Sequence, residues 1–181
     1  YCQMVFLGIR ADNFTFPSVL KACGLEQNLD FGRVVHKSID ASCLECLFVQ
    51  NALVSMYGAC GEVDYARKLF DKMPEKDAVT WNSMISGYAS KGMWGEAFAL
   101  FEGMRMEGIE LNIITWNTIA GGCLKTGNIL LDSVAALIGL GACSHVGLLK
   151  LGKEIHCVAI RSHFAEFDNV KNALINMYAR C

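Results

Sequence analysis

Four asparagines in this sequence stand in recurring surroundings, and their side chains have the chemistry to read a nucleotide base. Asn51 and Asn172 each begin the pattern Asn-Ala-Leu, whereas Asn82 and Asn117 each follow Thr-Trp. A carboxamide carries both a hydrogen-bond donor and an acceptor, as the Watson–Crick edge of a base requires. Asparagine is poorly suited to a helix interior because its amide competes for backbone groups, so helix capping is the alternative role. Both roles stay open at this point.

The cysteines and histidines do not form a recognisable metal or catalytic motif. Cys43 and Cys46 make the single Cys-x-x-Cys, without the second close pair of ligands that a structural zinc site usually has. The histidines His36, His145, His156 and His163 never begin His-x-Glu, which a zinc-dependent nucleobase deaminase needs. A Ser/His/Asp arrangement and a phosphate-binding loop are also missing from the sequence. We therefore expect no enzymatic activity, no cofactor and no metal.

The elements that would position the asparagines are pairs of short helices, seen most clearly in residues 78–112. Trp81, Met84, Ile85 and Tyr88 recur at helical spacing, and Gly92 follows where a helix would stop. A second apolar stripe then runs to Gly108, through Trp94, Ala97, Phe101 and Met104. Such a helix–turn–helix is too small to bury a core alone, so it needs neighbours.

Those neighbours are present as internal repeats. The segment 51–60 recurs as 172–181, the segment 80–88 as 115–123, and the segment 29–36 as 149–156. Self-similarity with a period of about 30–36 residues is typical of helical solenoids, and the tetratricopeptide repeat of about 34 residues fits this period as well. The fold class that this predicts is all-α: a right-handed α–α superhelix of helix–turn–helix repeats.

The pieces Val-Thr-Trp-Asn-Ser-Met-Ile-Ser-Gly-Tyr, Ala-x-x-Leu-Phe-x-x-Met and Glu-Gly-Ile-x-Leu-Asn go further than the period. They resemble the pentatricopeptide repeat, an RNA-binding relative common in plant organelles, over essentially the whole chain. The mixture of repeat lengths is similar to the plant subgroup with 35-residue, longer and shorter repeats. On this resemblance we divide the chain into the tail of a preceding repeat (1–12), a longer-type repeat (13–46), a short repeat (47–77), a full 35-residue repeat (78–112), a truncated repeat (113–132), a second longer-type repeat (133–167) and the first helix of a short repeat (168–181).

The truncated repeat lacks about 15 residues, most of a second helix. Either that helix is simply absent, or residues 129–143 fill its place. The sequence does not choose between these arrangements.

Within the resemblance, the four asparagines hold the fifth position of their repeats, and the family pairs this residue with the last one of the same repeat. Asn51 with Asp77 would favour uridine, and Asn82 with Asn112 would favour a pyrimidine, cytidine more than uridine. Asn117 leans the same way but has lost its partner in the truncation, and Asn172 has none within the chain. The longer-type repeats carry Pro17 with Cys46 and Leu137 with Phe167, which fit no such rule.

The resemblance also implies that the second residue of a repeat is wedged between adjacent bases. Phe48, Val79 and Ile114 hold this position. Ordinary packing at the start of a helix is an equally good explanation of these three residues.

Composition limits what the chain can bind. Its net charge of −2 leaves no excess of basic residues to neutralise phosphates, so RNA binding would depend on stacking and base-edge hydrogen bonds. Two complete pairs at roughly 1–3 kcal/mol per base give about 2–6 kcal/mol, which is less than the ~8 kcal/mol of micromolar binding. The sequence has no run of about 18 apolar residues, so we expect no membrane span. The chain begins at Tyr1, and we expect a fragment whose targeting peptide lies outside it.

Repeat register suggests that most of the unusual residues fill the core. Cys23, Cys123 and Cys143 share the eleventh position with tyrosines of other repeats, as expected of reduced core thiols. His36 and His156 replace the phenylalanines of other second helices, which predicts packing roles. Gly32 and Gly152, four residues earlier, are predicted to let adjacent helices approach closely.

These observations predict a chain that binds single-stranded RNA with a leaning toward pyrimidines and recruits editing or processing factors. The resemblance implies a mitochondrion or a chloroplast. Two alternatives remain: a protein-binding helical scaffold of the tetratricopeptide kind, and a truncated inactive copy.

Overall fold

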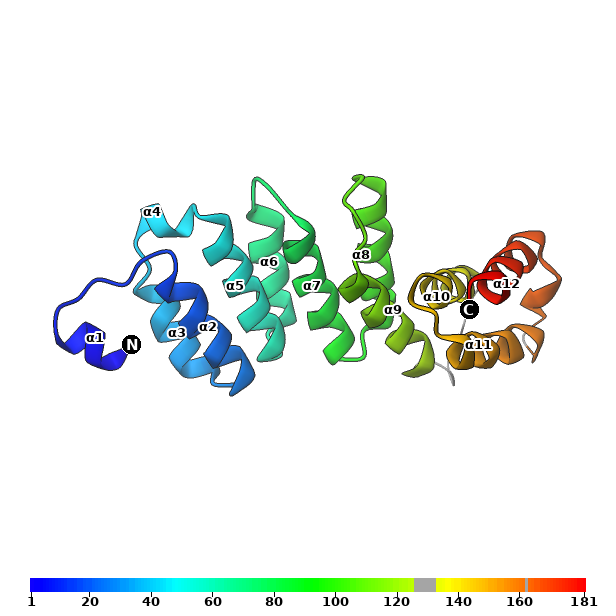
Figure 1. Cartoon of the computed structure of the whole chain (residues 1–181). Coiled ribbons are helices and arrows are strands. Elements are labelled where there is room, and N and C mark those ends of the chain that lie inside the picture. The colour runs from blue at the N-terminus through cyan, green and yellow to red at the C-terminus, as the bar shows by residue number, and fades with distance from the viewer. Residues whose placement is uncertain (126–132, 162) are drawn as a thin grey trace. The chain divides into compact units, whose positions relative to one another are not determined.

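The structure, a computed structural model, describes residues 1–125, 133–161 and 163–181. Every element assigned within these ranges is a helix, which confirms the all-α prediction (Figure 1). The helices are α1 (Cys2–Phe6), α2 (Thr15–Leu25), α3 (Leu29–Lys37), α4 (Ala41–Leu44), α5 (Leu47–Ala59), α6 (Val63–Lys72), α7 (Ala78–Ser90), α8 (Trp94–Met106), α9 (Ile113–Lys125), α10 (Ser133–Val146), α11 (Leu149–Arg161), the 3-10 turn η1 (Phe164–Glu166) and α12 (Asp168–Arg180). The chain divides into a first half, Tyr1–Met93, and a second half, Trp94–Cys181.

The first half consists of two layers of helices. The first helices of consecutive repeats, α2, α5 and α7, lie side by side, and the second helices α3 and α6 pack on them (Figure 1). Completely buried side chains fill the space between the layers, among them Leu20, Val35, Val54 and Met84. Because each helix presents one apolar stripe, the two-layer arrangement buries all of the stripes together.

Glycines set the spacing of the first layer. A Cβ atom on Gly87 would lie 3.2 Å from the Cα of Gly58, and a Cβ on Gly58 would lie 3.3 Å from the Cα of Gly87. The backbones of α5 and α7 therefore meet directly, at a distance that leaves little room for a side chain on either glycine. The predicted role of Gly32 is also confirmed, because a Cβ there would meet the side chain of Met56, as one on Gly152 would meet that of Met177.

The second half repeats the layered packing within its described residues. Helices α9, α10 and α12 lie in series, α8 packs on α9, and α11 contacts α9, α10 and α12. Helix α10 packs on α9 and α12 as a first helix would, and α11 follows it in the position of a second helix. The connection at 126–132, where we placed the end of the truncated repeat, lies outside the described residues.

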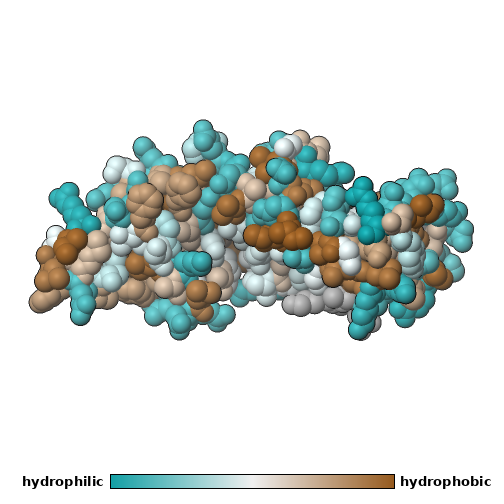
Figure 2. Space-filling view, in the orientation of Figure 1, coloured by the Kyte–Doolittle hydropathy of each residue, from teal (hydrophilic) through white to brown (hydrophobic). Residues whose placement is uncertain are grey.

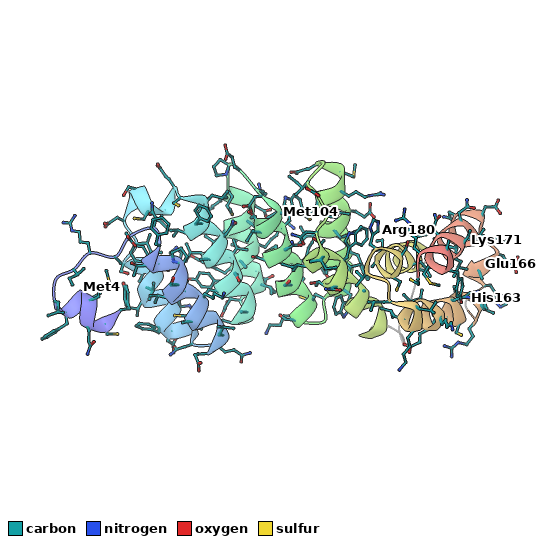
Figure 3. All side chains as sticks on the ribbon, in the orientation of Figure 1. Met4, Met104, His163, Glu166, Lys171 and Arg180 are labelled. Carbon is teal, nitrogen blue, oxygen red and sulfur yellow. The ribbon has the colours of Figure 1, made fainter. Side chains whose placement is uncertain are left out.

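The second helices of two repeats end in the same local structure. Gly8 and Gly108 both adopt positive φ, of 73° and 72°, after a helix. Beyond them the N–H of Ile9 donates to the carbonyl of Met4, and that of Ile109 to the carbonyl of Met104, residues labelled in Figure 3. This is the Schellman type of helix ending, and it supports the interpretation of residues 1–12 as the tail of a repeat. At the start of α12, Lys171 forms an ion pair with Glu166 at 3.6 Å.

Histidine and tyrosine side chains connect the second helix of each longer-type repeat to the next first helix. The Nδ1 atom of His36 lies 2.9 Å from the hydroxyl of Tyr57, and that of His156 lies 2.9 Å from the hydroxyl of Tyr178. Both histidines are half-buried. The predicted packing role of these histidines is confirmed.

The thiols differ strongly in accessibility. Cys23 and Cys143 are buried as predicted, whereas Cys2 and Cys157 are exposed; the side chain of Cys123 lies outside the described residues. Burial, helped by the neighbouring Cys181, raises the pKa of Cys143 to about 11.

We expect iodoacetamide at pH 8 to modify Cys2 and Cys157 first and Cys143 roughly 100-fold more slowly, because the thiolate is the reactive species. Mass spectrometry of the labelled peptides at short times measures the rates. Equal rates in the folded chain would contradict the burial of Cys143, and denaturant should remove the difference.

Candidate nucleic-acid interface

The last residue of a repeat caps the first helix of the next repeat. Asp12, Asp77 and Asn112 each stand three residues before a threonine, and each Oδ1 atom accepts a hydrogen bond from that threonine's backbone N–H. The distances are 2.8 Å at Thr15, 2.9 Å at Thr80 and 3.1 Å at Thr115. A side-chain oxygen at this position satisfies a backbone donor that would otherwise lack a partner. The residue that the resemblance assigns to base reading thus also fixes the start of the following helix.

Asn51 and Asp77 are brought together by the fold. The Nδ2 atom of Asn51 donates to Oδ1 of Asp77 at 3.1 Å, although the residues are separated by 26 positions. The hydroxyl of Thr80 lies 2.6 Å from Oδ1 of Asn51 and 2.9 Å from Oδ1 of Asp77. These three side chains form one cluster, which we call the Asn51 cluster. It joins helix α5 to the first turn of α7.

The Asn51 cluster holds a carboxylate in its charged form. Burial acts to raise the pKa of Asp77, but hydrogen bonds from Thr80 and Asn51 outweigh it and hold the pKa below the ordinary value of 3.8. The hydrogen bonds from Asn51 and Thr80 all use Oδ1, and the backbone N–H of Val79 also donates to the carboxylate. Oδ2 of Asp77 is an acceptor and the second amide hydrogen of Asn51 is a donor, the two kinds of group that a base edge pairs with.

The four asparagines differ in exposure. Asn51 and Asn82 are only 5% and 8% exposed, whereas Asn117 and Asn172 are exposed. Two of the four amides are therefore largely covered by neighbouring groups, and two lie at the surface. The physical reason is clear for Asn51, because the capped start of the next repeat's first helix lies over its amide. Asn82 also has interactions with its surroundings.

The proposed stacking residues are all exposed. Phe48 is 71% exposed, and Val79 and Ile114 are each 56% exposed, near the starts of α5, α7 and α9. Phe14, 81% exposed at the corresponding place before α2, belongs to the same series and was missed from the sequence. Its position as the second residue of the repeat 13–46 was the available signal. Figure 2 shows exposed apolar residues scattered among hydrophilic ones on one face.

Other kinds of site find little support in the described part of the chain. No helix there is long and apolar enough to span a bilayer. Nor do three or more His, Cys, Asp or Glu side chains gather there as metal ligands would.

The sequence is similar to that of known pentatricopeptide repeat proteins. A sequence profile of the PPR repeat family matches residues 76–125, and a profile of the PPR repeat matches residues 51–77. The pentatricopeptide repeat-containing protein At1g22830 of Arabidopsis thaliana is 51% identical over 100% of this chain and 28% of its own length. The chloroplastic pentatricopeptide repeat-containing protein At5g55740 of the same plant is 36% identical over 99% of this chain and 19% of its own. The chain thus spans well under a third of these relatives.

A solved structure has the same fold. The crystal structure of the pentatricopeptide repeat protein PPR10 in complex with an 18-nt psaJ RNA element superposes with a TM-score of 0.54. The match covers 98% of this chain and 29% of PPR10, at 18% identity, and so concerns the fold alone. The chain therefore carries pentatricopeptide repeats at residues 51–125 and is similar over its whole length to plant pentatricopeptide repeat proteins.

Proposed function

We propose that this chain binds single-stranded RNA along its first helices, reading one base with each complete fifth-and-last pair. The observation that carries the proposal is the 3.1 Å contact between Asn51 and Asp77. It brings two residues that are distant in the sequence close enough to contact the same base. The repeat class is known to read one base per repeat with two or three side chains, and the solved neighbour was crystallised with RNA. The repeat boundaries given above, with the fifth and last residues they define, belong to the same proposal.

Base preference follows from the pairs. Asn51 with Asp77 selects uridine, and Asn82 with Asn112 selects a pyrimidine with cytidine favoured. Asn117 and Asn172 contribute single amides, both exposed. Phe48, Val79 and Ile114, with Phe14 added from the structure, offer exposed apolar surface between successive bases. Stacking on such surface contributes to affinity without selecting a base.

The biological setting is proposed from the relatives. We infer that the chain acts in a plant mitochondrion or chloroplast, where it positions an RNA for editing or processing factors. The chloroplastic name of one relative supports the organelle. The subgroup with mixed repeat lengths is supported by the presence of repeats both with and without an asparagine at the fifth position.

Asp77→Asn tests the reading of bases while keeping the oxygen atom that caps α7. Asparagine is a good N-cap, and Asn112 already serves this way before α9. The substitution turns a carboxylate edge into an amide edge, so the preference of this repeat should move from uridine toward cytidine. Competition anisotropy with short oligo-U, oligo-C and oligo-A RNAs should show the U-to-C affinity ratio falling by roughly 3- to 10-fold, the value of one hydrogen bond.

Asp12→Asn is the matched control. Asp12 accepts the same backbone hydrogen bond, from the N–H of Thr15 at the start of α2, but no fifth-position partner for it lies within the chain. It should leave the ratio unchanged. A ratio that does not respond to Asp77→Asn counts against base reading by the pair. Failure of the chain to bind any of the three RNAs points instead to a protein-binding scaffold or an inactive copy.

A further inference from the structure

A cavity in the first half lies beside its second helices, α3 and α6. It has a volume of about 440 Å³ and is lined by residues of α3, α5, α6 and the segment after α3: Arg33, His36, Lys37, Ile39, Leu44, Tyr57 and Tyr65. We call it the tyrosine pocket. It includes none of the residues proposed above to read or stack bases, so it does not rest on the proposed function.

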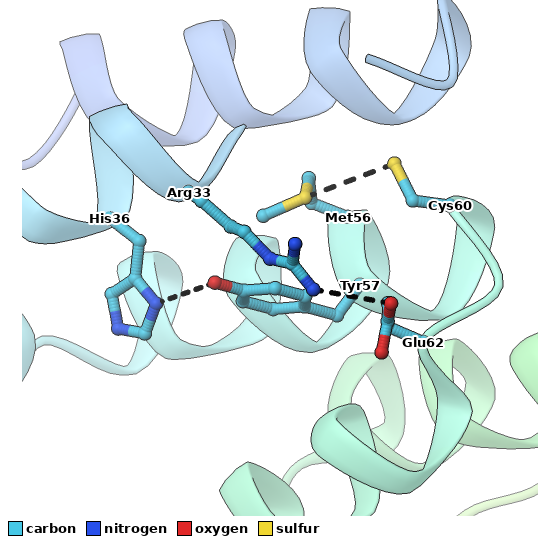
Figure 4. Close-up of polar contacts among 6 residues, drawn as sticks. All are labelled: Arg33, His36, Met56, Tyr57, Cys60 and Glu62. Carbon is cyan, nitrogen blue, oxygen red and sulfur yellow. Dashed lines mark hydrogen bonds and ion pairs between the residues drawn. The ribbon is translucent and has the colours of Figure 1, made fainter. Parts of the chain in front are cut away.

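Three aromatic rings form one wall of the tyrosine pocket. The ring centroids of Tyr57 and Tyr65 lie 4.5 Å apart, and the ring of His36 lies 5.7 Å from Tyr57 and 6.3 Å from Tyr65. The hydrogen bond between His36 and the Tyr57 hydroxyl fixes two of these rings (Figure 4). Tyr57 is buried, whereas Tyr65 is 42% exposed and presents the accessible ring. A planar group can therefore stack on Tyr65 without rearrangement of the wall.

The charges around the tyrosine pocket favour an anion. Arg33 and Lys37 line it and no acidic residue does. Arg33 uses Nη2 to pair with Glu62 at 3.2 Å (Figure 4), which leaves other guanidinium donors for a ligand. Lys37 takes part in no ion pair within the described residues. Two cationic side chains therefore line the pocket, and only Arg33 is paired with a carboxylate, that of Glu62 outside the lining.

We propose that the tyrosine pocket binds one nucleotide, with the base stacked on Tyr65 and the phosphate held by Arg33 and Lys37. Exposed aromatic and cationic side chains together are the combination that holds single nucleotides of a strand. The cavity is also much larger than an inorganic phosphate needs. The nucleotide is either free or the 5′-phosphorylated end of an RNA, since both offer the same base and phosphate.

The second longer-type repeat shows which parts of the pocket are not simply structural. It keeps the histidine–tyrosine contact, as His156 with Tyr178. However, Cys157 stands in place of Lys37, so the second copy lacks one of the two cations that line the pocket. The histidine–tyrosine contact thus belongs to the repeat fold, whereas Lys37 is particular to the first copy.

Isothermal titration of the full chain with 5′-UMP, uridine and inorganic phosphate tests the proposal. We expect 5′-UMP to bind about 10-fold more tightly than uridine or phosphate alone, because its base can stack on Tyr65 while its phosphate contacts Arg33 and Lys37. Lys37→Gln, at an exposed position, should weaken 5′-UMP about 10-fold, as expected for a hydrogen bond to a charged group. Tyr65→Leu should weaken it about 5-fold or more through lost stacking. The matched control, Lys153→Gln in α11, should have no effect.

Three outcomes would overturn the assignment: no binding of 5′-UMP, equal binding of phosphate alone, or equal sensitivity to Lys37→Gln and Lys153→Gln. A 5′-phosphorylated trinucleotide RNA distinguishes the sources. Tighter binding of this RNA than of 5′-UMP, lost in Lys37→Gln, identifies an RNA end as the ligand, whereas equal or weaker binding identifies a free nucleotide. Because Asp77→Asn does not touch the pocket, the two proposals fail separately.

Discussion

Gly87→Val is expected to lower the stability of the first half by about 1–3 kcal/mol, the usual cost of overpacking a close contact. The nearest atom to a new Cβ is the Cα of Gly58 at 3.2 Å, and Val63 stands 3.8 Å away. A backbone atom cannot turn aside as a flexible side chain does, so α5 and α7 must separate. The gain in helix propensity from removing glycine, at most about 0.5 kcal/mol for valine, is too small to compensate. Hydrogen exchange should show faster opening of amides in residues 47–90.

Gly95→Val provides the matched control for this prediction. Gly95 lies near the start of α8 and a Cβ there meets nothing within 4 Å. The same substitution should therefore change thermal stability little, within about 0.5 kcal/mol as for most surface changes. If both variants unfold alike, the direct contact of the α5 and α7 backbones is not what holds the first layer together.

Much of the fold could be predicted because helical periodicity and repeat register constrain each other. Trp81, Met84, Ile85 and Tyr88, expected on one face, are all at most 6% exposed. Gly92, expected to end this helix, has φ of 72° just beyond α7. Each repeat must bury its stripe against its neighbours, so a pattern found several times along the chain leaves few alternatives.

The contacts between neighbouring first helices could not be predicted in the same way. Gly58 and Gly87 stand at different positions of their repeats, the twelfth and the tenth, so register gave no sign that they face each other. Their contact depends on the lateral offset of α5 and α7. Gly32 and Gly152 were found because the surrounding sequence recurs as a block.

The burial of the candidate site could not be predicted from the sequence. The donor and acceptor groups of the amides predict base reading, and the family resemblance predicts the pairing of Asn51 with Asp77. The sequence did not predict that the hydroxyl of Thr80 would contact both Oδ1 of Asn51 and Oδ1 of Asp77. Its hydroxyl belongs to the next repeat, and the sequence does not say how deeply one repeat covers the amide of the one before it.

The strongest effect at the candidate site is expected for Asp77→Ala, which should destabilise the chain by about 2–4 kcal/mol. The change removes the N-cap of α7, worth roughly 0.5–2 kcal/mol. It also leaves the Asn51 amide, 5% exposed, without its acceptor, at a cost of about 1–3 kcal/mol. Denaturant unfolding followed by circular dichroism measures the loss. Asp77→Asn keeps the cap oxygen and should lose less than half as much.

The dependence on pH separates this capping charge from a packing effect. Because the pKa of Asp77 is held below 3.8 in the folded chain, its stabilisation is complete above the unfolded value and is lost as the pH falls through the folded value. The stability difference between the native chain and Asp77→Ala should therefore be constant from pH 7 to about 5 and shrink below pH 3.8. A difference that stays constant into acid would mean that the carboxylate charge contributes nothing. Asp77 would then act through shape alone, and Asn51 would need another explanation for its burial.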